Sequence, residues 1–270
     1  MLSPLFGQLS PLRVPTRVAA AAPDADALAY IAAVEAADGQ TLEEGVAAAF
    51  TDFIVGCKSD GIWSSLKSSC ILAGARTLDG ALVPLVGAAP TNNNFVSADY
   101  NRETGLKGDG STKFLNSNRA NNADPQNSKH LAVFSTEIVT TAQRNLIGAG
   151  VISNNGSIIQ LYTTTSYRNR LNSANVVTTV TAANDTGLTA INRNSSSSFT
   201  FRHENTNFTV TATSAAGVNL NTFVFAGSIS SGASGYNANR ISFYSLGENI
   251  DLAALDTRVS TLMTQISATL

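Results

Sequence analysis

The alternation of apolar and polar residues between positions 187 and 247 constrains the fold of this chain more than any other feature. Two runs follow a period of two on either side of a polar turn at residues 204–207. Their apolar-face residues are Phe199, Phe201 and His203 in the first run and Phe208, Val210 and Ala212 in the second. Because this period places alternate side chains on opposite faces of a strand, the runs predict a β-hairpin with one buried face.

Further short strands are predicted on both sides of this hairpin. Residues 221–229 predict a strand with Phe223 and Phe225 on one side, and residues 240–247 predict one with Ile241 and Phe243 opposed to Tyr244 and Leu246. Earlier strands are predicted at residues 130–139, 146–149, 157–162, 167–171 and 176–180. Many short strands separated by turn signals, without a fixed-period repeat, are typical of a sandwich or jelly roll.

A small helical segment is predicted before the strands. Residues 24–38 have helical apolar spacing, with Asp24 or Asp26 near the start and Gly39 just past the end. Thr41 and Glu44 have the spacing of a capping box, which predicts the start of a second helix. Residues 62–70 predict a third, short helix.

The C-terminal residues predict one more helix, which Asp251 can cap. Its apolar residues have heptad spacing; they are Leu252, Leu255, Val259, Leu262 and Ile266. This seam either pairs with another helix or covers the sandwich. The expected fold is mainly β: an antiparallel jelly-roll sandwich (71–250), preceded by a small helical segment (24–70) and followed by a C-terminal helix (251–270).

The first 23 residues form an apolar arm that four prolines interrupt, which favours extended backbone. Its large apolar residues are Leu2, Leu5, Phe6, Leu9 and Leu12. The arm is either a disordered tail or a docking segment that lies in a groove on a partner. As a signal peptide it is poor, because no basic residue precedes its apolar part.

Charge and composition exclude several classes of partner. The net charge is −2 and no Lys/Arg run exists, so no nucleic-acid partner is expected. No apolar run reaches the roughly 20 residues of a membrane span, so no membrane insertion is expected. Cys57 and Cys70 are either buried free thiols or a disulfide, and neither lies in a metal-ligand pattern. No metal and no cofactor are therefore expected.

No catalytic group is expected either. Glycoside cleavage needs two carboxylates about 5 to 9 Å apart, which on one strand means acids at i and i+2 or i+4. Glu137, Glu204 and Glu248 have no such partner, and the Asn-rich loop 116–128 has too few carboxylates for a Ca²⁺ site. His130 and His203 both fall on predicted strands as structural residues.

Tyrosines beside amide and guanidinium groups are the candidate binding residues. Exposed aromatic rings stack on sugars, and neighbouring polar groups fix their orientation. The candidate glycan-binding residues are Tyr162, Tyr167, Arg168, Asn169, Tyr236 and Asn237. The alternative is that these are ordinary edge and loop tyrosines.

Several segments together resemble a known family. Residues 105–115, 130–139, 186–213 and 240–251 resemble the concanavalin A-like, laminin-G-like jelly roll. The helical lead-in at residues 29–40, with residues 56–63, looks like a module that precedes such domains in tail and other virion proteins of bacteriophages.

This resemblance implies a non-enzymatic structural or adhesive virion protein: a tail fibre, spike or capsid decoration assembled in the host cytoplasm. Its implied partners are other virion proteins, further copies of the same chain in a homo-oligomer, and host surface polysaccharide. The alternative is a secreted or cell-surface carbohydrate-binding module.

Overall fold

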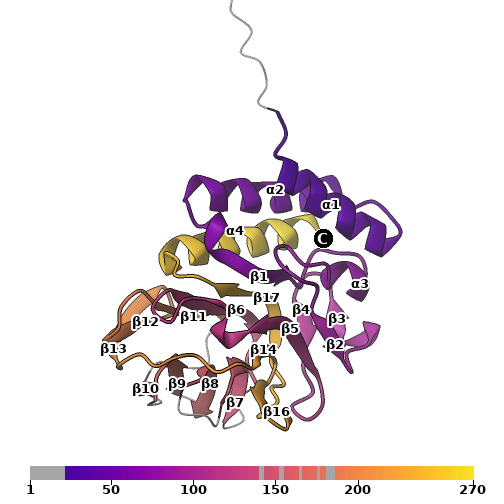
Figure 1. Ribbon diagram of the computed structural model, residues 1–270. Coiled ribbons are helices and arrows are strands. Elements are labelled where there is room, and N and C mark those ends of the chain that lie inside the picture. Colours follow the sequence, from indigo (N-terminus) through magenta and orange to yellow (C-terminus); the bar gives the residue numbers. More distant parts are fainter. Residues whose placement is uncertain (1–21, 140–142, 152–154, 164–165, 175–176, 181–185) are drawn as a thin grey trace, which may run out of the picture.

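The computed structural model describes residues 22–139, 143–151, 155–163, 166–174, 177–180 and 186–270. These residues form three layers: helices, an eight-stranded sheet and a nine-stranded sheet (Figure 1). The predicted fold class, a mainly β antiparallel sandwich with a helical segment before it and a helix after it, is confirmed.

The eight-stranded sheet lies in the middle of the molecule. Its strand order is β13-β12-β11-β6-β17-β4-β3, and β1 also pairs with β17. The strands are β1 (Leu66–Ile71), β3 (Tyr100–Asn101), β4 (Gly105–Lys107), β6 (Lys129–Glu137), β11 (Gly187–Arg193), β12 (Ser198–His203), β13 (Thr206–Thr211) and β17 (Arg240–Gly247).

The nine-stranded sheet covers one face of the eight-stranded sheet. Its order is β10-β9-β8-β7-β14-β5-β2, with the β15-β16 hairpin attached to β7. The strands are β2 (Thr91–Asn93), β5 (Phe114–Ala120), β7 (Arg144–Ala149), β8 (Ser157–Thr163), β9 (Ser166–Leu171), β10 (Val177–Val180), β14 (Asn221–Val224), β15 (Gly227–Ile229) and β16 (Gly232–Ser234).

The helices cover the other face of the eight-stranded sheet (Figure 1). They are α1 (Ala25–Asp38), α2 (Glu44–Ser59), the short α3 (Leu78–Ala81) and α4 (Leu252–Thr269), with 3-10 turns η1 (Trp63–Ser65), η2 (Ser97–Asp99) and η3 (Asn121–Ala123). Asp24 caps α1 with its carboxylate, and Gly39 ends that helix at φ 68°, as predicted.

The predicted hairpin is formed by β12 and β13. Glu204 and Asn205 are its two loop residues and both have positive φ, the conformation that matches the twist of paired strands. Phe201 lies opposite Phe208 in the register, and Phe201 is fully buried between the two sheets.

Two apolar cores result from this layering. The first lies between the helices and the eight-stranded sheet, and strands contribute Ala132 and Phe243 to it. The second lies between the two sheets and takes Leu131 and Val133 from the same strand as Ala132. The eight-stranded sheet is therefore apolar on both faces, as a buried middle layer must be.

A β-bulge changes the predicted faces of β17. The pairing of β17 with β6 shifts between Ile241 and Phe243, so one extra residue enters the strand there. Ile241 consequently joins Tyr244 and Leu246 in the core between the sheets, while Phe243 packs under the helices. The prediction that Ile241 and Phe243 share a face was wrong, because strict alternation ends at a bulge.

Three local predictions differ from the structure. Of the helix expected over residues 62–70, only the 3-10 turn η1 forms. Residues 66–71 instead form strand β1, which pairs with β17 and lies inside the predicted helical segment. The Thr41–Glu44 capping box does not form, since Glu43 is the N-cap of α2 and makes no side-chain cap bond. The expected strand over 221–229 is broken into β14 and β15 at Phe225, whose φ is 67°.

The heptad-spaced residues of α4 are buried within this chain. All five seam residues belong to the core between the helices and the eight-stranded sheet. Arg258 on α4 pairs with Asp60 after α2, and Arg202 on β12 pairs with Asp256 on α4. The helix thus covers the sandwich, as the second alternative predicts, and it also packs against α2 of the same chain.

Cys57 and Cys70 are both buried free thiols and do not form a disulfide. Cys57 belongs to the core beneath the helices, and Cys70 belongs to the core between the two sheets. The proposed docking residues Leu2, Leu5, Phe6, Leu9 and Leu12 lie outside the described residues.

Candidate functional site

A row of polar side chains crosses the outer face of the nine-stranded sheet. Asn145 of β7 lies opposite Gln160 of β8, and Gln160 lies opposite Arg168 of β9. Because residues that are paired across antiparallel strands project from the same face, the three side chains form a ladder perpendicular to the strands. The ladder places two amides and one guanidinium side by side on the face that points away from both cores; Gln160 and Arg168 are partly exposed there, whereas Asn145 is buried.

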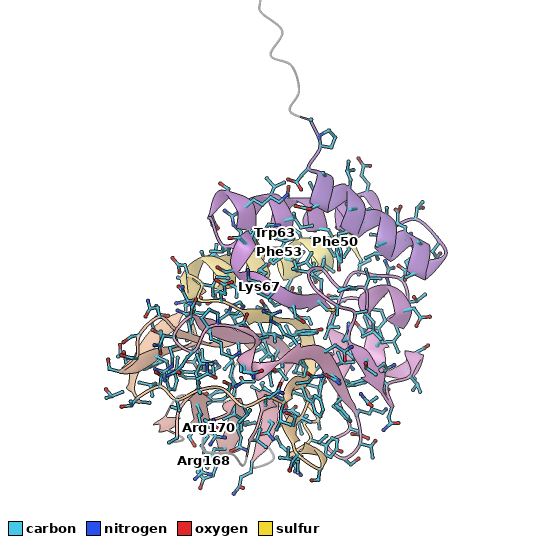
Figure 2. The ribbon with its side chains drawn as sticks, in the orientation of Figure 1. Phe50, Phe53, Trp63, Lys67, Arg168 and Arg170 are labelled. Atoms are coloured by element: carbon cyan, nitrogen blue, oxygen red, sulfur yellow. The ribbon has the colours of Figure 1, made fainter. Side chains whose placement is uncertain are left out.

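Alternation along β9 separates core residues from surface residues. Tyr167 and Leu171 belong to the core between the sheets, whereas Arg168 and Arg170 project from the opposite face. Figure 2 shows both arginines at the end of the molecule farthest from the helices. Arg170 donates from Nη2 to the carbonyls of Gly150 and Val151, at 2.9 and 3.0 Å, and thereby supports the loop after β7.

The amides of the ladder are held by a chain of hydrogen bonds. Gln160 Nε2 donates to Asn145 Oδ1 at 2.9 Å, and Asn145 Nδ2 donates to the carbonyl of Ser234 at 2.9 Å. The backbone amide of Asn145 donates to the carbonyl of Gly235 at 2.8 Å. A Cβ at Gly235 would lie 2.3 Å from Asn145 Nδ2, so this close approach requires glycine.

Arg168 is positioned by an aromatic ring. Its guanidinium carbon lies 3.9 Å from the ring centroid of Tyr162, within the range of a cation–π contact. The contact covers one face of the Tyr162 ring, which is half-buried. Arg168 Nε is buried and has no hydrogen-bond partner among the described residues.

These groups surround a hollow of about 290 Å³. It is lined by Gln143, Asn145, Val151, Ile158, Gln160, Arg168, Ser234 and Gly235. The volume is near the lower limit of small-molecule sites, and amides, carbonyls and one guanidinium supply its polar groups. The arrangement can hold a small polyhydroxylated group by hydrogen bonds.

The structure brings together only part of the predicted glycan-binding set. Tyr162 and Arg168 are adjacent at the hollow, but Tyr167, Asn169 and Asn237 are fully buried. Tyr167 packs against the rings of Phe201 and His203, with centroids 5.6 and 4.8 Å apart. A side chain without exposed surface cannot contact a glycan, so the candidate set becomes smaller.

Tyr236 is half-buried and lies next to the hollow in sequence, after Gly235. Its ring packs edge-on against Phe114, with centroids 6.1 Å apart. Sequence reasoning missed Asn145 and Gln160, which the structure adds to the site. The alternation of Gln160 with Ile159 and Leu161 was the available signal, but only the strand register shows that Asn145 and Arg168 are its neighbours.

The two histidines are buried in the sandwich. The carbonyl of Glu248 can only accept, so His130 donates to it from Nδ1 and accepts from the Ser245 hydroxyl at 2.8 Å through Nε2. Burial lowers the pKa of His130 to about 4, which keeps the ring neutral near pH 7. His203 Nδ1 lies 3.0 Å from the Thr189 hydroxyl.

Carboxylates of the β region are engaged in ion pairs away from the hollow. Glu137 pairs with Lys107 at 2.7 Å, and this hydrogen bond lowers the pKa of the Glu137 carboxyl. Asp99 pairs with Lys113 at 2.6 Å, and Asp124 of the Asn-rich loop is buried beside Arg119.

Within the described residues, no group of three or more His, Cys, Asp or Glu side chains is placed to hold a metal ion. In the same part of the chain, none of the helices has the length and apolar character to cross a membrane.

A scan against protein-family models found no match, and a search of curated proteins also found none. Among solved structures, the chain is similar to a sialidase of Trypanosoma rangeli, with a TM-score of 0.48 and 10% identity over 74% of this chain and 33% of that one. It is also similar to the binding domain of botulinum neurotoxin serotype D, with a TM-score of 0.49 and 12% identity over 73% of this chain and 51% of that one. The chain thus spans about half or less of the length of these structures, and likenesses at these scores assign no function.

Proposed function

We propose that this protein is a non-catalytic glycan-binding protein that serves as an adhesive component of a bacteriophage particle. The observation that carries the binding part is the hollow beside the Asn145–Gln160–Arg168 ladder. Amide and guanidinium groups supply the donors and acceptors that sugar hydroxyls need, and Tyr162 supplies an aromatic surface at the rim.

The composition of the hollow supports binding without catalysis. Its lining residues include no carboxylate, whereas glycoside hydrolysis by the usual route requires two. The sequence has no Asp or Glu between Glu137 and Asp185, the stretch that contains β7, β8 and β9. A glycan held against the ladder would have neither a general acid nor a nucleophile from these strands.

The virion part rests on the resemblance of the helical lead-in and the sandwich to bacteriophage virion proteins. Attachment to the particle is assigned to the arm, through Leu2, Leu5, Phe6, Leu9 and Leu12. The burial of the α4 seam within its own chain supports this choice, because the seam has no apolar surface left for a coiled coil with another copy.

A glycan array with wild-type protein and the Arg168→Ala variant tests the binding part. We expect wild-type protein to bind a subset of glycans and the variant to lose that subset. Lys67→Ala is the matched control, because Lys67 lies on β1 near the helices and pairs with Glu248 (Figure 2). Equal binding by all three proteins, or no binding by wild-type protein, would contradict the assignment.

The second candidate function is a secreted or cell-surface carbohydrate-binding module, which the same hollow would serve. Fractionation distinguishes the two. A virion component copurifies with particles through a density gradient and is located on them by electron microscopy with a specific antibody. A secreted module stays in the particle-free fraction.

A further inference from the structure

The hollow on the nine-stranded sheet has one charged lining residue, Arg168, and the strands around it carry no acidic residue. The strands that line it come from two stretches, residues 138–184 and 205–247, and neither contains Asp or Glu. The same stretches contain Arg144, Arg168 and Arg170 on the nine-stranded sheet, and Arg240, which pairs with Glu137 on the other sheet. The strands that carry the hollow therefore have an excess of positive charge, although the whole chain has a net charge of −2.

Most cations of the described residues are neutralised by acids. Every lysine forms an ion pair with a carboxylate, and so do Arg76, Arg102, Arg119, Arg202, Arg240 and Arg258. Arg170 and Arg193 instead donate to backbone carbonyls. Among the described residues, Arg144 and Arg168 are left without either kind of partner, and Arg168 is the one that lines the hollow.

The guanidinium of Arg168 is fixed in place rather than free in solvent. The Tyr162 ring lies 3.9 Å from its central carbon, and its Nε is buried without a partner. A planar guanidinium presents its donors in a fork that matches the two oxygens of a carboxylate. Because one face of the fork is stacked on Tyr162, the donors at its edges remain for a ligand.

We infer that the hollow recognises an acidic glycan, and that Arg168 binds the carboxylate of a uronic-acid or similar carboxylated sugar. The hydroxyls of the same sugar bind the partly exposed amide of Gln160, which the buried Asn145 holds in place. This inference rests on the glycan-binding function proposed above and adds the chemical class of the ligand. No side chain that lines the hollow would repel the carboxylate.

Calorimetric titration with two matched ligands tests the inference. The probes are an oligogalacturonate and the same oligosaccharide after chemical reduction of its carboxyl groups, which is neutral. We expect wild-type protein to bind the acidic form at least about tenfold more tightly, the usual effect of one charge-assisted hydrogen-bonded contact. Because two opposite charges form this contact at the surface, raising the salt concentration should reduce the difference.

Variants assign the effect to Arg168. Arg168→Gln should remove the preference for the acidic form, and Arg168→Lys, which keeps the charge but loses the fork, should retain only part of it. Lys67→Gln changes the net charge equally at a distant site and should keep the wild-type preference. Circular dichroism melting of each variant shows that the sandwich is still folded.

The titrations distinguish failure of the acidic-sugar inference from failure of the glycan-binding function. Equal affinity of wild-type protein for both oligosaccharides, reduced for both by Arg168→Gln, would overturn the acidic-sugar inference and leave the glycan-binding function standing. If Lys67→Gln abolishes the preference for the acidic form as strongly as Arg168→Gln does, the preference depends on the net charge of the protein and not on Arg168. That result would overturn the inference. Absence of binding to either oligosaccharide at millimolar concentration would overturn the acidic-sugar inference, and absence of binding to every glycan of the array as well would overturn both proposals.

Discussion

Arg202 Nε lies 2.8 Å from Asp256 Oδ2, and this ion pair joins the eight-stranded sheet to the C-terminal helix. The two side chains are only 8% and 5% exposed. Asn207 also accepts a hydrogen bond from Arg202 Nη1 at 3.0 Å. Since both charges are removed from water, each depends on the other for its solvation.

Removal of the acid in this pair should destabilise the protein strongly. We expect Asp256→Ala to lower the free energy of unfolding by about 3–5 kcal/mol, because the Arg202 charge stays buried without its partner. The matched control is Asp60→Ala at the pair with Arg258, whose side chains are 33% and 25% exposed. That change should cost about 1 kcal/mol or less. Chemical denaturation measures both, and equal losses would show that burial of the first pair is not what matters.

The hairpin provides a second matched comparison. Phe201→Ala should cost about 3–5 kcal/mol, because Phe201 is fully buried and its removal leaves a cavity between the sheets. Phe208 lies directly opposite on β13 but is half-buried, so Phe208→Ala should cost clearly less. Thermal melting ranks the two variants, and the reverse order would contradict the layer assignment.

Protonation of His130 should couple stability to pH. The pKa of His130 is about 4 in the folded protein and 6.5 ordinarily, so the unfolded chain binds the proton more readily. The buried neutral ring contributes its full stability above about pH 6.5. As the pH falls toward 4, proton uptake by the unfolded chain lowers the free energy of unfolding by about 3 kcal/mol in total.

Unfolding free energies measured from pH 4 to 7 in wild-type protein and His130→Gln isolate this effect. The hydrogen bond with Lys107 lowers the pKa of Glu137, so this carboxylate stays paired over most of the range, and it titrates alike in both proteins. The difference between the two slopes therefore belongs to His130. The variant should show a smaller slope between pH 4.5 and 6.5. Parallel curves would mean that His130 titrates at its ordinary value in the folded state.

The two thiols should be unreactive while the protein is folded. Burial raises the pKa of both Cys57 and Cys70 to about 12, so almost no thiolate exists near pH 8. Ellman's reagent at pH 8 should titrate neither thiol in the native protein and both in guanidinium chloride. Rapid modification of the native protein would show that one of the cores opens readily.

Deletion of the arm should separate attachment from folding. A chain that starts at Asp24 keeps the N-cap of α1 and the ion pair between Asp24 and Lys58. We expect its melting temperature to stay within a few degrees of the full chain, and its incorporation into particles to be lost. Normal incorporation would place attachment elsewhere on the protein, and loss of cooperative melting would make the arm part of a core.

The sequence predicts most elements of this fold because local signals determine them. Alternation identifies β12, β13, β6 and β17, and caps identify the ends of α1 and the start of α4. Local signals could not show the bulge in β17, because a bulge is defined by the partner strand. The strand character of residues 66–71 was hidden for the same reason: it depends on pairing with a strand that lies far away in sequence.

The candidate site was predictable only in part. Tyr162 and Arg168 were identified by their chemistry, but the burial of Tyr167, Asn169 and Asn237 depends on which face of each strand meets the second sheet. Asn145 becomes a neighbour of Arg168 only through the three-strand register. Contacts between strands carry this information, and a single sequence does not display it.

The position of β17 sets the order in which the molecule can be completed during synthesis. This strand pairs with β6, β4 and β1, although its residues are translated more than a hundred positions after the last of these. Its Phe243 and the buried face of α4 also complete the core beneath α1 and α2. Neither the eight-stranded sheet nor the helical layer can therefore close until residues 240–269 have left the ribosome. Until then the emerging chain exposes the edge of β6 and the apolar faces of its first helices, so chaperones can bind these surfaces before residues 240–269 arrive.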